Sequence, residues 1–98
     1  MSEITTAYES MFVFSVKNGE DSTKENVEKF KGIIESGAAL ESVDEWGKRR
    51  LSYLINKESE GYYVLFHFTA GPNFPAELER IAGITDGVLR TLVVKKEA

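Results

Sequence analysis

The fold of this chain is decided by the stretch Trp46-Gly47-Lys48-Arg49-Arg50-Leu51-Ser52-Tyr53-Leu54-Ile55-Asn56-Lys57. Its second half alternates like a β-strand with one better-buried face, which holds Leu51, Tyr53 and Ile55. An isolated glycine inside a strand, here Gly47, indicates a β-bulge or the close approach of another backbone. Three adjacent cations next to a tryptophan favour a recognition surface over a catalytic pocket.

The strand that contains this stretch is predicted to cover residues 39–56. A second strand is predicted for residues 62–69, which alternate between a more and a less apolar face. Only the short segment 57–61 joins the two strands, so we expect them to pair as a β-hairpin.

The flanking sequence predicts one strand and one helix on each side of this hairpin. Residues 7–16 alternate as a strand does. A capping-box pattern from Ser22 to Glu25 then predicts the start of a helix, which Gly37 ends. A second helix is predicted for residues 75–83 with proline at its first position, and an apolar strand covers residues 88–95.

The element order is therefore β-α-β-β-α-β. Right-handed crossovers fold this order into a ferredoxin-like α+β sandwich, with a four-stranded antiparallel sheet and two helices on one face. The predicted strand order is fourth, first, third, second, and residues 1–98 form one domain. Because no helix remains for the second sheet face, apolar side chains there mark a candidate interaction site. They are Met11, Val13, Tyr63 and Leu65.

Composition narrows the class of function. The chain has 98 residues, no cysteine and a formal net charge of −4. Without cysteine, disulfides and thiolate chemistry are excluded. Residues 1–46 hold four basic and ten acidic side chains, whereas residues 47–98 hold eight basic and six acidic ones. This charge favours a localised phosphate contact over a long basic groove. With no apolar run long enough for a membrane helix and no visible signal peptide, we expect a cytoplasmic protein without a membrane partner.

The sequence offers little for catalysis. His67 is the only histidine, and its place between two phenylalanines in a strand favours a structural or surface role over that of a general base. The loop 17–21 has one glycine and two acids, so it lacks the character of a phosphate-binding loop. We therefore expect no catalytic residue, metal ligand, cofactor or small-molecule substrate. Two other hypotheses are a metabolite-binding regulatory domain that forms a homodimer through its open sheet face, and an acylphosphatase-like enzyme.

The chain as a whole resembles the family of the sixth protein of the bacterial small ribosomal subunit. The strongest match is the segment 47–56. Further matches lie in order along the chain: Tyr8-Glu9, Trp46, Gly61-Tyr62-Tyr63, Glu77-Leu78, Val88-Leu89-Arg90 and Val93-Val94-Lys95. Their spread across all predicted elements makes the resemblance specific.

The resemblance implies a non-enzymatic component of the cytoplasmic ribosome. Such a protein binds the central domain of the small-subunit ribosomal RNA together with small-subunit protein eighteen. It also implies which residues make these contacts. The RNA-binding candidates are Tyr8, Arg90, Lys95 and Lys96. The partner-binding candidates are Asp44, Glu45, Trp46, Arg49 and Arg50. These last residues lie on a predicted edge strand, where charges also act against self-pairing.

Overall fold

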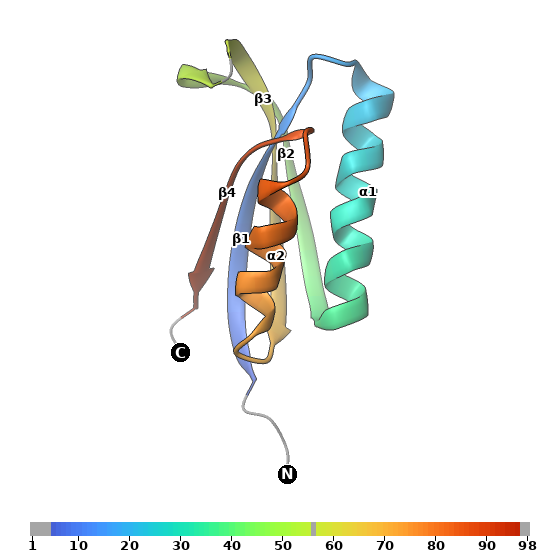
Figure 1. The fold of residues 1–98 in the computed structure, drawn as a ribbon, viewed down its shortest axis with the longest axis vertical. Coiled ribbons are helices and arrows are strands. Elements are labelled where there is room, and N and C mark those ends of the chain that lie inside the picture. Colours follow the sequence, from blue (N-terminus) through green and yellow to red (C-terminus); the bar gives the residue numbers. More distant parts are fainter. Residues whose placement is uncertain (1–4, 56, 97–98) are drawn as a thin grey trace.

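The computed structural model describes residues 5–55 and 57–96. Figure 1 shows two helices on one face of a four-stranded sheet, and both ends of the chain lie at the same end of the molecule. The elements are β1 (Thr6–Ser15), α1 (Glu20–Gly37), β2 (Ala39–Ile55), β3 (Glu58–Ala70), α2 (Phe74–Gly83) and β4 (Val88–Lys95).

The sheet order is β2-β3-β1-β4, and each neighbouring pair is antiparallel. The predicted ferredoxin-like architecture and strand order are thus confirmed. Strands β2 and β4 are the edges, so each has one side without a neighbour among the described residues. Neither helix is long and apolar enough to cross a membrane.

The core lies between the helices and the sheet, and aromatic rings dominate it. Phe12 is fully buried and packs against Phe14, Phe30 and Phe66 at centroid distances of 5.5, 4.8 and 5.5 Å. These rings come from three different elements, so their burial holds α1 on the sheet. The alternation predicted for the first and third strands is the cause, because every second residue of each strand faces the helices.

The start of α1 differs from the prediction. The helix begins at Glu20 with Gly19 as its N-cap, so the capping box expected on Ser22 is wrong. Gly19 has a positive φ of 94°, which turns the chain into the helix earlier than the pattern suggested. The Thr23 hydroxyl donates to the carbonyl oxygens of Gly19 and Ser15, both at 3.0 Å, and this ties the first turn to the end of β1.

The β2–β3 hairpin also differs in detail. Strand β3 begins at Glu58, four residues before the predicted start, and so the connection is shorter than expected. The pairing of β2 with β3 shifts register between Arg50 and Ile55. Within the segment where the register shifts, the Leu51 side chain is buried, whereas Tyr53 is 59% exposed. The expectation that Leu51 and Tyr53 share one buried face is therefore wrong.

Candidate interaction surfaces

The five partner-binding candidates all lie on β2, and all of them are exposed. Because β2 is an edge strand, its outer side is open to another molecule along the described residues. The predicted bulge at Gly47 is confirmed: the register shifts between Glu45 and Gly47, and Gly47 has a φ of 87°. Trp46 has no register partner on β3, which makes it the extra residue.

The Trp46 side chain forms a stack on the open face of the sheet. Its ring is nearly parallel to that of Tyr63, at 8° and a centroid distance of 6.5 Å. The guanidinium carbon of Arg49 lies 5.5 Å from the Trp46 ring centroid, which is a cation–π distance. Trp46 nevertheless keeps 47% of its surface exposed. A large, pre-positioned aromatic side chain next to a cation is typical of an interface hot spot.

Asp44 begins a row of polar contacts that runs across β3 and β1 to Lys96, the residue that follows β4. Its Oδ2 atom lies 3.3 Å from Nε2 of His67, and Nδ1 of His67 lies 3.7 Å from Oε1 of Glu9. The same Glu9 oxygen lies 4.0 Å from Nζ of Lys96. This row links the partner-binding candidate Asp44 to the RNA-binding candidate Lys96. The contact of His67 with Glu9 depends on the register that pairs them, which the sequence pattern does not give.

Glu45 points to the other face of β2, toward the helices. Its carboxylate accepts a hydrogen bond of 2.8 Å from the Tyr62 hydroxyl. This hydrogen bond, with burial and the charges of Glu45 and Glu20, raises the pKa of Tyr62 above its ordinary value of 10.0. Glu45 is thus held in place, although its side chain is exposed.

The RNA-binding candidates are not one cluster. Tyr8 and Lys95 are register partners on the helix-bearing face, and the Tyr8 ring stacks on Phe68 at 5.7 Å. Lys96 lies at the same end of the sheet but contacts Glu9 on the open face. Arg90 precedes Lys95 by five residues along β4, roughly 17 Å at the usual rise of a strand. The candidates therefore define one site at the start of β1 and the end of β4, and a second, separate position at Arg90.

Arg90 has a partner that the sequence did not suggest. Its guanidinium donates a hydrogen bond to the hydroxyl of Tyr53, which comes from the irregular end of β2. The long separation of these residues in sequence gave no signal for the contact. Tyr53 and Arg90 together extend the exposed aromatic and cationic surface that begins at Trp46.

Apolar side chains occupy the middle of the open face. Met11 pairs with Leu65 on one side and with Leu92 on the other, and Leu92 is 56% exposed. The expectation of an uncovered apolar face therefore holds for Met11, Tyr63 and Leu65, which are half-buried. It is wrong for Val13, which is only 4% exposed. Both Val13 and Leu51 lie close to Gly61, so the irregular end of β2 adds to the cover at this point.

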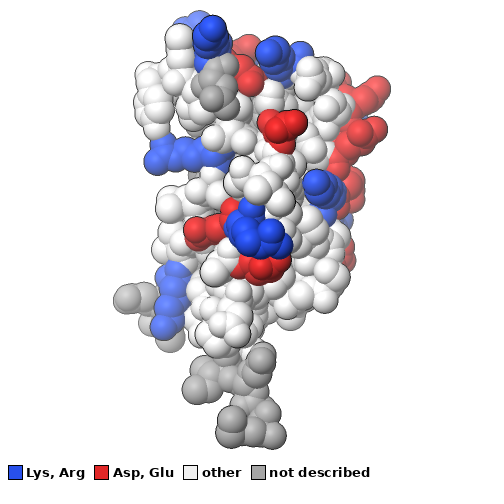
Figure 2. All heavy atoms as spheres, in the orientation of Figure 1, with Lys and Arg blue, Asp and Glu red and all other residues white. Residues whose placement is uncertain are grey.

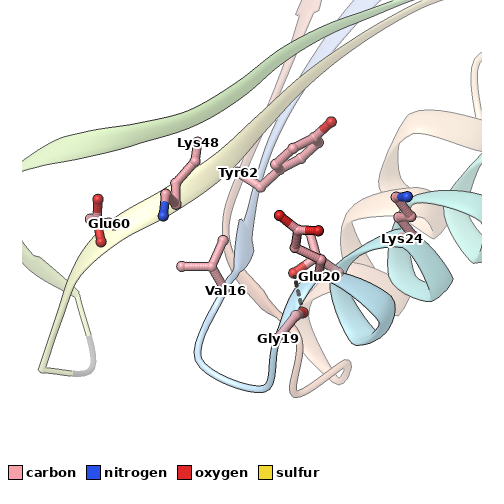
Figure 3. Close-up of a pocket in the computed structure, with 8 residues that line it drawn as sticks. Val16, Gly19, Glu20, Lys24, Lys48, Glu60 and Tyr62 are labelled. Atoms are coloured by element: carbon pink, nitrogen blue, oxygen red, sulfur yellow. Dashed lines mark hydrogen bonds between the residues drawn. The ribbon is translucent and has the colours of Figure 1, made fainter.

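The helix-bearing face has a different electrostatic character. Figure 2 shows acidic side chains along the outer side of α1, while the basic side chains on this face stand apart from one another. A hollow of about 570 Å³ lies between the start of α1 and the β2–β3 hairpin. Figure 3 shows Lys48 and Glu60 on one side of this hollow and Glu20 and Lys24 on the other. Its mixed charge selects neither an anion nor a cation. The described residues contain no group of three or more acidic or histidine side chains suited to a metal ion.

The fold and these surfaces define a ferredoxin-like α+β protein with an uncovered sheet face and an exposed, charged edge strand. Comparison with known proteins identifies the family within this fold class. The family model described as ribosomal protein S6 matches residues 7–95. The chain belongs to this family, whose members are proteins of the small ribosomal subunit, and the expected location on the cytoplasmic ribosome follows.

Individual relatives agree with this assignment. The chain is 53% identical over 91 residues to small ribosomal subunit protein bS6 of Clostridium novyi, covering 92% of this chain and 96% of that protein. It is 48% identical over 91 residues to the bS6 protein of Clostridium botulinum strain Loch Maree, covering 92% of this chain and 97% of that protein. The crystal structure of 30S ribosomal protein S6 from Thermotoga maritima superposes with a TM-score of 0.84 at 30% identity, covering 95% of this chain and 89% of that one.

Proposed function

We propose that this chain binds the central domain of the small-subunit ribosomal RNA as a heterodimer with small-subunit protein eighteen. The observation that supports it most directly is the β2 edge. This strand is paired on one side only, and its five candidate residues are all exposed. The partner docks along this edge, where the Trp46 ring provides its apolar anchor.

Charge explains why a partner is needed. The chain has a net charge of −4, which opposes the approach of RNA over most of its surface. A basic partner supplies cations that neutralise RNA phosphates and is attracted by Asp44 and Glu45. The joint particle then presents a basic surface that the acidic chain lacks alone.

The RNA contact of this chain itself is localised. Lys95 and Lys96 lie next to each other at the end of β4, where Tyr8 pairs with Lys95. Two ammonium groups reach phosphates there, and the partly exposed Tyr8 ring offers an edge to a ribose or base. Arg90 makes a separate contact from the other end of β4, where its hydrogen bond to Tyr53 holds the guanidinium in position.

The first experiment is a titration of the protein against a central-domain fragment of the small-subunit ribosomal RNA, with and without protein eighteen. Tight binding only with both proteins supports the joint unit. If the RNA fragment is not bound either with or without protein eighteen, the proposal is contradicted and the regulatory-domain hypothesis is favoured instead.

Variants then locate the two contacts. Lys95→Ala and Arg90→Ala are each expected to weaken RNA binding by the joint unit and to lower its salt slope by about 1. Lys17→Ala, a cation in the exposed loop before α1, is the control and is expected to leave both unchanged. If Lys95→Ala and Arg90→Ala show the same salt slope of RNA binding as the Lys17→Ala control, then Lys95 and Arg90 do not belong to the RNA site.

Trp46→Ala tests the docking edge. We expect it to weaken capture of protein eighteen at least 10-fold, because a buried aromatic anchor is worth about 2 kcal/mol or more at an interface. Ile84→Ala is the matched control, since Ile84 is an apolar side chain that is 71% exposed and lies far along the chain from β2. Capture at the unaltered affinity by the Trp46 variant would place the interface elsewhere.

A further inference from the structure

His67 lies between two carboxylates on the open face of the sheet. Its Nε2 atom is 3.3 Å from Oδ2 of Asp44 on β2, and its Nδ1 atom is 3.7 Å from Oε1 of Glu9 on β1. The His67 side chain is only 15% exposed, whereas those of Asp44 and Glu9 are 59% and 41% exposed. The ring is therefore held against the sheet, while both of its acidic neighbours reach the solvent.

A neutral imidazole can donate to only one of these carboxylates, because it has a single N–H group. The shorter contact, to Asp44, takes that proton on Nε2. Nδ1 is then an acceptor that faces another acceptor, and it is a buried atom without a hydrogen-bond partner in the part of the chain that the structure describes. A protonated ring has two N–H groups, so it can donate to Asp44 and Glu9 together.

Glu9 connects this ring to an RNA-binding candidate. The same Oε1 atom that faces Nδ1 of His67 lies 4.0 Å from Nζ of Lys96. The backbone amide of Lys96 donates a hydrogen bond of 2.9 Å to the carbonyl oxygen of Ala7, which fixes the residue beside β1. An N–H group that His67 gains toward the Glu9 oxygen therefore competes with the Lys96 ammonium for it.

The other side chains around the ring leave this competition unchanged. The neighbours of His67 on the same face of β3 are Leu65 and Thr69, which do not titrate. The Thr69 hydroxyl donates to the carboxylate of Glu41 on β2, so this acid is directed to Thr69 rather than to the ring. Protonation of His67 therefore acts on the two carboxylates that flank it.

We infer that His67 is a positioning residue for the RNA contact at Lys96, and that it acts through Glu9. While the ring is neutral, Glu9 holds the Lys96 ammonium against β1. When the ring takes up a proton, its Nδ1–H group donates to Glu9, and Lys96 is released toward an RNA phosphate. The inference rests on the proposed function, because it concerns how the RNA contact of that function is made.

The direction of the resulting pH dependence follows from this competition. Histidine is the side chain that ordinarily changes its charge between about pH 5 and pH 8. The affinity of the joint unit for RNA is therefore expected to rise as pH falls through this range. We expect a change of about 2–5-fold, because exposed ion pairs such as that of Glu9 with Lys96 are weak. The change decreases as salt rises, since salt screens exposed charges.

Two variants that fix the charge at His67 provide the test. The readout is the dissociation constant for the central-domain RNA fragment with protein eighteen present, measured near the two ends of that pH range. His67→Gln stays neutral and is expected to bind at both pH values as weakly as the unaltered protein does at the higher one. His67→Arg stays charged with several donors, and is expected to bind at both values as tightly as the unaltered protein does at the lower one. Because the chain has no other histidine, the comparison isolates this ring.

Two further variants show whether the effect runs through Glu9 and Lys96. Glu9→Gln cannot form an ion pair with the ammonium, so it is expected to bind RNA tightly at both pH values. Lys96→Ala is expected to bind weakly at both values, although the histidine is intact. The matched control is Glu79→Gln, which removes an exposed carboxylate from α2 and is expected to keep the full pH dependence. A purely structural role of His67 would produce neither the recovery by arginine nor the effect of Lys96→Ala.

Each outcome has a distinct meaning, once urea unfolding has verified that the variants are folded. The inference is overturned if His67→Gln or Lys96→Ala keeps the pH dependence of the unaltered protein, while the proposed function stands because RNA is still bound. A joint unit that binds no RNA at any pH removes the proposed function, and this inference with it.

Discussion

Gly61 offers a sharp test of how the β2–β3 hairpin packs on the rest of the sheet. The residue is buried in β3 between β1 and β2, where it pairs with Ser15 and Arg49. A Cβ atom placed on Gly61 would lie 2.4 Å from a methyl carbon of Val13 and 3.5 Å from Leu51. The first distance is far inside the contact range of about 3.5–4.0 Å for two carbons.

The magnitude follows from that overlap. Gly61→Ala requires Val13 to move by about 1 Å, and overpacking of this kind costs about 1–3 kcal/mol. The alanine substitution offsets up to about 1 kcal/mol of this loss in stability, because alanine loses less backbone entropy than glycine when a strand forms. Taken at the middle of both ranges, the net loss is about 1 kcal/mol. For a domain of this size that loss lowers Tm by about 4–8 °C.

A double-mutant cycle with Val13→Ala identifies the cause. The single Val13→Ala change removes buried methyl groups and costs about 2 kcal/mol. In the double variant the new methyl group occupies the space that Val13 leaves, so we expect the two losses to fall short of their sum by about 1 kcal/mol or more. Urea unfolding of the four proteins gives the coupling.

Gly32→Ala is the matched control for this cycle. Gly32 is exposed on α1, and a Cβ atom there meets nothing within 4 Å. This variant is expected to gain about 1 kcal/mol from helix propensity. A Gly61→Ala protein as stable as the unaltered one, or losses that simply add in the cycle, would refute an overlap of the new methyl group with Val13.

Three further predictions concern the surface. The raised pKa of Tyr62 means that its hydrogen bond to Glu45 stabilises the fold fully below pH 10.0 and is lost as pH rises through the higher folded pKa. Tyr62→Phe is therefore expected to remove this alkaline fall in stability, measured by urea unfolding at pH values from about 8 to 11. The side-chain hydrogen bond from Arg80 lowers the pKa of Glu77 below 4.5, so its small contribution is present above pH 4.5 and is lost as pH falls through the folded pKa. Glu77→Gln is expected to reduce stability only above that range, and an equal reduction at pH 2 would contradict this. Gly47→Ala is expected to cost about 1 kcal/mol through its positive φ of 87° alone, because a Cβ atom there meets nothing within 4 Å; thermal unfolding measures it, and an unchanged Tm would mean that the bulge is not strained.

The fold was predictable because its core follows simple periodicity. Alternation in the first and third strands predicted that Phe12 and Phe66 face the helices, and both are fully buried. The last strand was predicted for residues 88–95, and β4 covers the same residues. The starts of α1 and β3 were less predictable, since Gly19 and the short turn at Lys57 both use positive φ angles that a pattern of side chains does not report.

The exposure of the candidate residues on an edge strand was predictable, but their contacts were not. A run of charges next to Trp46 predicted an exposed edge strand, and β2 is one; its role as an interaction surface stays a prediction. The contact of Asp44 with His67, and that of Arg90 with Tyr53, join residues 23 and 37 positions apart. Both depend on strand register and on the irregular end of β2, which propensity and spacing do not determine.

The bulge at Gly47 gives the β2 edge its chemical character. Trp46 and Arg49 are three residues apart, so in a regular strand they would point to opposite faces. Their cation–π contact at 5.5 Å exists because the extra residue brings them to the same face. The same shift places Asp44 and Arg49 together on the open face. One bulge therefore determines both the exposed aromatic ring proposed as the anchor for protein eighteen and the cation that lies against it.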